Sequence, residues 1–68
     1  MSNKVYKRNV TILRKIFLKH IPQPTSEQQN VFEYDIQNIT VLSKKILSEK
    51  ELEHIFLYSI YPALPKGE

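Results

Sequence analysis

The sequence predicts an all-α fold of three helices, and three observations indicate it. Apolar residues recur at the spacing of one helix face through most of the chain. The chain has a single glycine, whereas β-hairpin folds use glycine in their turns. Its prolines fall between or after the periodic segments. We therefore expect one domain over residues 1–68, with helices at about 4–21, 26–47 and 49–61 and an extended tail at 62–68.

The first helix is predicted from Lys4 to about residue 21, a segment without acidic residues up to its end. On a helical wheel at about 100° per residue, one half is apolar, with Asn9 and His20 among the apolar side chains. Pro22 and Pro24 end the helix, because proline lacks an amide donor and disfavours helix in the residue before it. The opposite half is basic and carries Lys4, Lys7, Arg8, Arg14, Lys15 and Lys19.

The second helix is predicted from the N-cap candidates Thr25 and Ser26, each followed three residues later by a glutamine. No turn signal interrupts the chain before Leu47, so we expect one continuous helix to that residue. The alternation of apolar residues near Tyr34 and the β-branched residues at 39–41 leave a strand over 32–42 as the alternative. The apolar face of the helix comprises Val31, Phe32, Ile36, Ile39, Leu42, Ile46 and Leu47.

The third helix has the clearest local signal in the chain. Ser48 and Glu51 have the spacing of a capping box, and Leu47 and Leu52 have that of a hydrophobic staple. Apolar residues then recur at helical spacing until Pro62, which ends the helix.

A homodimer is expected from the length of the second helix. At about 1.5 Å per residue it would be about 33 Å long, so its neighbours would leave part of its apolar face uncovered. A second copy packed along this helix would cover that face. The expected dimer or partner interface comprises Tyr34, Asp35, Ile39, Val41 and Leu42.

Asp35 lies on the expected buried face of the second helix, and a buried carboxylate needs a partner. Arg14, Lys15 or His20 of the first helix is a candidate partner. The alternative is that Asp35 lies at the edge of the face and reaches water.

The residues that carry out most enzyme chemistry lack any recognisable arrangement. The absence of cysteine excludes disulfides, zinc–thiolate sites and thiol catalysis. His20 and His54 are far apart, and neither has a second histidine at helical spacing. No glycine-rich phosphate loop or nucleophile–base pair is present. We therefore expect no enzymatic activity, no metal, no cofactor and no small-molecule substrate.

Charge is distributed unevenly along the chain. Residues 1–26 hold six basic residues and no acid (+6), and residues 27–68 hold seven acids and four basic residues (−3), which gives the net charge of +3. The basic half of the first helix is interpreted in three ways. It is a solvated face partly neutralised by Glu49, Glu51 and Glu53, a nucleic-acid contact, or a contact for an acidic protein or a membrane surface.

These observations favour a small helical regulator or adaptor that binds another protein or a second copy of itself. The alternative is a nucleic-acid-binding protein that uses the basic half of the first helix, and the third possibility is peripheral membrane association. We expect a cytoplasmic protein, because no apolar run approaches the roughly 20 residues of a membrane span and the N-terminus lacks a secretory signal.

Overall fold

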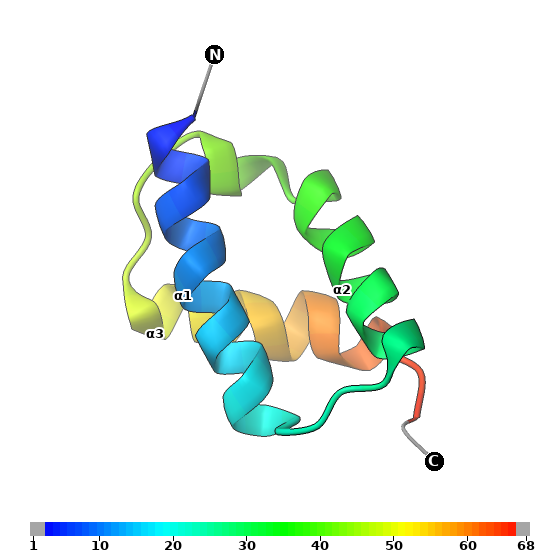
Figure 1. Ribbon diagram of the computed structural model, residues 1–68. Helices are drawn as coiled ribbons and strands as arrows, with labels where there is room; N and C mark the ends of the chain where they lie inside the picture. The colour runs from blue at the N-terminus through cyan, green and yellow to red at the C-terminus, as the bar shows by residue number, and fades with distance from the viewer. Residues whose placement is uncertain (1–2, 67–68) are drawn as a thin grey trace.

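The computed structural model describes residues 3–66, and in this range it is all-helical without strands. The elements in chain order are α1 (Lys4–His20), α2 (Ser26–Asn38), the 3₁₀ helix η1 (Thr40–Ser43), α3 (Glu49–Ile55), the π-helical segment η2 (Phe56–Ile60) and the 3₁₀ turn η3 (Tyr61–Ala63). Figure 1 shows α1 and α2 in front, with α3 and η2 crossing behind them. The prediction of an all-α fold with three helices is confirmed.

α1 forms over almost the residues predicted. Its N-cap is Asn3, whose Oδ1 accepts a hydrogen bond from the amide of Tyr6 at 3.0 Å. At the other end the amide of Ile21 still donates to the carbonyl of Phe17 at 2.8 Å, and Pro22 follows. The predicted end at residue 21 is therefore within one residue of the observed end.

Capping boxes begin both other α-helices. Thr25 and Gln28 exchange side-chain-to-amide bonds of 3.1 and 2.9 Å at the start of α2. Ser48 and Glu51 do the same at the start of α3. The predicted box at Ser48 is confirmed, and of the two candidate caps for α2 the structure uses Thr25.

The predicted continuation of α2 to Leu47 is wrong, and so is the alternative of a strand over 32–42. α2 ends at Asn38, whose Nδ2 donates to the carbonyl of Tyr34 at 2.9 Å, and Ile39 is extended with φ −93° and ψ 93°. β-branched residues at 39–41 are poor helix formers. The break turns the chain back so that Leu42 and Leu47, 0% and 3% exposed, both reach the core.

The core joins all three α-helices and the segments between them. Phe17 of α1 stacks on Phe32 of α2, with ring centroids 4.4 Å apart, and meets Phe56 at 6.2 Å. Aromatic pairs of this kind add stability beyond the area that they bury. The buried hydrophobic residues are Val10, Leu13, Ile16, Phe17, Phe32, Ile36, Leu42, Leu47, Leu52, Phe56 and Ile60.

The predicted tail over 62–68 is described only up to Lys66, and residues 67–68 lie outside the described range. Pro62 belongs to η3, and the chain is extended at Leu64. The carbonyl of Pro65 accepts a hydrogen bond from Nε2 of Gln28 at 2.9 Å, which attaches this segment to the start of α2. None of the helices over residues 3–66 is long and apolar enough to cross a membrane.

Candidate functional site

The basic half of α1 is exposed, and its six cations fall into two groups. Arg14 forms a two-pronged ion pair with Glu33 of α2, in which Nη2 and Oε1 are 3.0 Å apart, and this hydrogen bonding raises the pKa of Arg14. Lys19 lies 3.6 Å from Glu53 of α3. The other four make no ion pair within residues 3–66; they are Lys4, Lys7, Arg8 and Lys15.

Only Glu53, among the three acids of α3 expected to neutralise the basic half, pairs with it. Its Oε2 also lies 3.2 Å from Nε2 of His20. The hydrogen bond from His20, followed by the charge of Lys19, lowers the pKa of Glu53. The partner of Arg14 was not predicted from the sequence, because Glu33 becomes its neighbour only when α1 and α2 pack together.

The two histidines lie in different aromatic environments. The ring of His20, at the end of α1 as expected, stacks on Phe56 with centroids 5.4 Å apart. His54 is exposed, and its ring centroid lies 4.4 Å from that of Tyr58. Within residues 3–66, no group of three or more His, Cys, Asp or Glu side chains is placed to hold a metal ion.

Asn9 is fully buried and fixes the chain between η1 and α3 against α1. Its Nδ2 donates to the carbonyls of Leu42 and Lys45, both at 2.9 Å. Its Oδ1 accepts from the amide of Leu47 at 3.1 Å. This single side chain therefore satisfies three backbone groups, one in η1 and two in the connection between η1 and α3.

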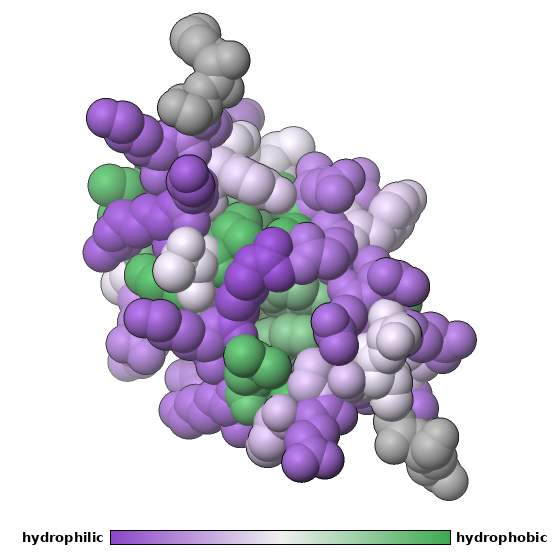
Figure 2. All heavy atoms as spheres, in the orientation of Figure 1, coloured by the Kyte–Doolittle hydropathy of each residue, from purple (hydrophilic) through white to green (hydrophobic). Residues whose placement is uncertain are grey.

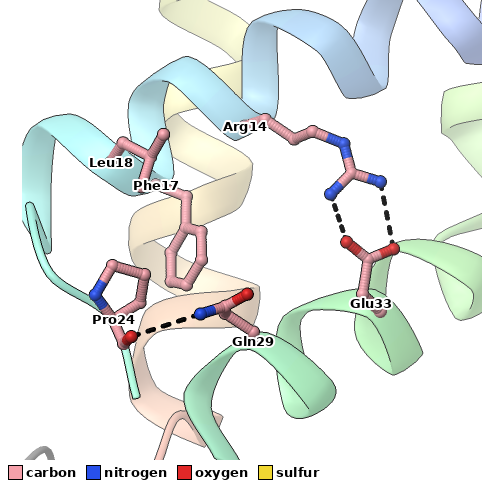
Figure 3. Close-up of a pocket in the computed structure, with 6 residues that line it drawn as sticks. All are labelled: Arg14, Phe17, Leu18, Pro24, Gln29 and Glu33. Carbon is pink, nitrogen blue, oxygen red and sulfur yellow. Dashed lines mark hydrogen bonds and ion pairs between the residues drawn. The ribbon is translucent and has the colours of Figure 1, made fainter. Parts of the chain in front are cut away.

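A groove of about 300 Å³ lies between α1 and α2. Figure 3 shows the ring of Phe17 pointing into the groove and the Arg14–Glu33 pair crossing from one helix to the other. Gln29 donates to the carbonyl of Pro24 at 3.2 Å on the opposite side. Figure 2 shows hydrophobic atoms in the hollow between hydrophilic rims. The lining residues are Arg14, Phe17, Leu18, Pro24, Gln29 and Glu33.

A second surface is apolar and aromatic, and it lies on η2 and η3. Leu57, Tyr58 and Tyr61 expose 38%, 72% and 48% of their surface. We define these three residues as the tyrosine face. A hollow of about 420 Å³ adjoins it at Tyr61 and is also lined by Ile21, Gln28, Pro62, Leu64, Pro65 and Lys66. The sequence contains a signal for this face, because no Lys, Arg, Asp or Glu occurs from His54 to Pro65.

Comparisons with protein-family models, curated proteins and solved structures find no match to this chain.

The expected interface residues on the second helix are not brought together on one exposed face. Tyr34 is 68% exposed, Ile39 and Val41 are half-buried against the core, and Leu42 is fully buried within the chain. Leu42 is therefore not available to a partner. The excess helix length that motivated a homodimer is also absent, because α2 has 13 residues.

Asp35 is half-buried, and none of its expected basic partners pairs with it. Within residues 3–66, its Oδ2 is buried without a hydrogen-bond partner. Burial raises the pKa of the Asp35 carboxyl. Arg14 and His20 pair with glutamates instead, so the predicted ion pair from α1 to Asp35 is wrong.

Proposed function

We propose that the protein is a small, non-enzymatic helical regulator or adaptor that acts by binding protein, with a second copy of the chain as its first partner. The observation that carries this proposal is the tyrosine face. Tyrosine is enriched at protein interfaces, because its large rigid ring has an apolar body and a polar tip. Leu57, Tyr58 and Tyr61 present this chemistry on consecutive turns of one helical segment.

The charge distribution favours a second copy as the occupant of this face. In a symmetric dimer the same patch of both copies meets at the axis, so a strongly charged patch would repel itself. The segment from His54 to Pro65 has no Lys, Arg, Asp or Glu. The basic half of α1, in contrast, would bring like charges together.

The hollow beside Tyr61 supports the same proposal. Interfaces gain most of their affinity where an aromatic or apolar side chain of one partner enters a pocket of the other. The hollow of about 420 Å³ is partly lined by apolar residues, including Ile21 and Leu64. It therefore provides room for a side chain that projects from the opposing tyrosine face.

Sedimentation velocity of the chain and of two matched variants tests the proposal. Tyr58 and Tyr34 are similarly exposed, 72% and 68%, but lie on different surfaces. We expect the parent chain to sediment at twice its mass of 8.1 kDa. Tyr58→Ser should sediment as a monomer, and Tyr34→Ser should behave as the parent.

Two results would contradict the proposal. One is a parent chain that stays monomeric up to about 1 mM, where even micromolar self-association is saturated. The other is a dimer that Tyr34→Ser dissociates and Tyr58→Ser leaves intact, which would place the interface on α2.

A further inference from the structure

We infer that the N-terminal part of α1 and the loop after η1 form one phosphate-binding surface for double-stranded nucleic acid. We call it the composite basic surface, and it comprises Lys4, Lys7, Arg8, Lys15, Lys44 and Lys45. All six residues are exposed. The inference does not depend on the proposed protein-binding function, because the tyrosine face lies on other elements.

Asn9 of α1 and Asn3, the N-cap of α1, hold the loop beside the helix. Asn3 donates from Nδ2 to the carbonyl of Ser43 at 3.2 Å, and buried Asn9 donates to the carbonyl of Lys45 at 2.9 Å. Lys44 lies between these two attachment points. The two loop lysines are therefore fixed next to the helix that carries the other four cations, although they are 29 to 41 positions away in sequence.

Most of this charge is not neutralised within the molecule. The four α1 residues of the surface make no ion pair within residues 3–66, unlike Arg14 and Lys19. The charge of Lys45 makes a small contribution to the lowered pKa of Glu51. That carboxylate is mainly engaged with the amide and hydroxyl of Ser48. Figure 2 shows hydrophilic side chains crowded along the visible face of α1.

The surroundings of these cations favour a duplex over a single strand. Proteins that bind single strands stack the bases on exposed aromatic side chains. The two aromatic residues of α1 do not provide this: Phe17 is buried against Phe32, and half-buried Tyr6 directs its hydroxyl to the carbonyl of Ile36 at 3.5 Å. Basic side chains that have no exposed aromatic side chain beside them contact phosphates and do not stack on bases.

A membrane surface fits less well, because insertion into lipid headgroups requires an exposed apolar face on the same helix. The apolar half of α1 is used in the core, where Val10, Leu13, Ile16 and Phe17 are all buried. From Lys4 to Lys15 the helix extends about 16 Å. Phosphates of one strand of a duplex are spaced about 3.4 Å apart along the duplex axis, so this length corresponds to about five of them. We therefore expect the composite basic surface to neutralise about five phosphates.

Fluorescence anisotropy with a labelled DNA duplex of mixed sequence tests the inference. With about five phosphates neutralised, log K should fall with log salt at a slope of about −4.5. Raising salt from about 50 mM to about 200 mM should then weaken binding by a few hundredfold. A single-stranded oligonucleotide of the same length should bind more weakly than the duplex.

Charge-removing variants locate the surface. Arg8→Gln and Lys44→Gln should each weaken duplex binding about tenfold at low salt and reduce the salt slope by about one. Lys66→Gln is the matched control, because it removes the same charge at the other end of the chain and should leave binding within about twofold of the parent. Arg14→Gln should also have little effect, because Glu33 already neutralises Arg14. Unchanged circular dichroism shows that each variant is folded.

Four results would overturn the inference. They are no duplex binding at low salt, tighter binding of the single strand, equal weakening by Lys66→Gln and Lys44→Gln, and binding of poly-glutamate or anionic vesicles without binding of the duplex. The last result would assign the surface to an acidic protein or a lipid headgroup. None of these results bears on whether the tyrosine face forms a dimer, so the two proposals fail separately.

Discussion

Replacing Asn9 by alanine should remove a large part of the stability of this fold. The substitution deletes three hydrogen bonds and leaves the buried carbonyl of Leu42 and the buried amide of Leu47 without their partner. Each unsatisfied buried group costs about 1–3 kcal/mol, so we expect a loss of about 3 kcal/mol. A chain of this length has a total stability of about 3–10 kcal/mol. The variant should therefore be marginally folded at room temperature.

Urea unfolding followed by circular dichroism at the helical band measures this loss. With a slope of about 1 kcal/mol per molar urea, the midpoint should fall by about 2–3 M. Asn38→Ala is the matched control, since Asn38 is exposed and makes one hydrogen bond within its own helix. Its stability should stay within about 0.5 kcal/mol of the parent. If Asn9→Ala is no less stable than Asn38→Ala, then Asn9 does not hold the loop against α1.

Three further predictions follow from the charged side chains. Burial raises the pKa of Asp35, so ionisation of this group costs stability as pH rises above its ordinary value of 3.8. Asp35→Asn should therefore be more stable than the parent at neutral pH but not below pH 3.8, and an equal difference at both would contradict this reasoning. The pKa of Glu53 is lowered, mainly by the hydrogen bond from His20, so its contribution is present above its ordinary pKa of 4.5 and is lost as pH falls through the folded-state value. Carbon-detected NMR titration should show this lowered pKa, and His20→Ala should return it towards 4.5; an unchanged titration would refute the assignment. A double-mutant cycle on Arg14 and Glu33 should give a coupling of about 0.2–1 kcal/mol that weakens with salt, because both side chains are partly exposed. A coupling that salt leaves unchanged would indicate a contact other than the ion pair.

Local signals were sufficient to predict where the helices begin. The capping boxes at Thr25 and Ser48 are encoded by residues three positions apart, so no distant contact is needed to form them. The end of α1 is likewise encoded by Pro22. The amphipathic pattern of α1 correctly placed its apolar residues in the core and its cations in solvent.

The end of α2 was not predictable in the same way, because neither glycine nor proline marks it. The apolar spacing through Ile39, Leu42 and Ile46 fits a continuous helix as well as it fits the observed break. The part of the chain after the break is held by Asn9, more than thirty positions away, which satisfies backbone groups of Leu42 and Leu47 only when α1 packs against them. Asn9 was recognised on the apolar face of the first helix, but its partners are determined by tertiary contacts.

The candidate surfaces were predicted to different extents. The six cations of α1 were identified from the sequence, whereas the pairing of Arg14 with Glu33 and the addition of Lys44 and Lys45 depend on the packing of segments. The tyrosine face was not predicted, because only the structure shows how much of Tyr58 stays exposed once the third helix has packed.

The central claim is that the uncharged tyrosine face, not α1 or α2, is where this protein binds protein. The most direct measurement is a series of ¹H–¹⁵N NMR spectra of the parent chain at increasing concentration. We predict concentration-dependent shifts over His54–Leu64, with the α1 amides from Lys4 to Lys15 unchanged. Shifts centred on α1 or around Tyr34, or a spectrum independent of concentration, would contradict the claim.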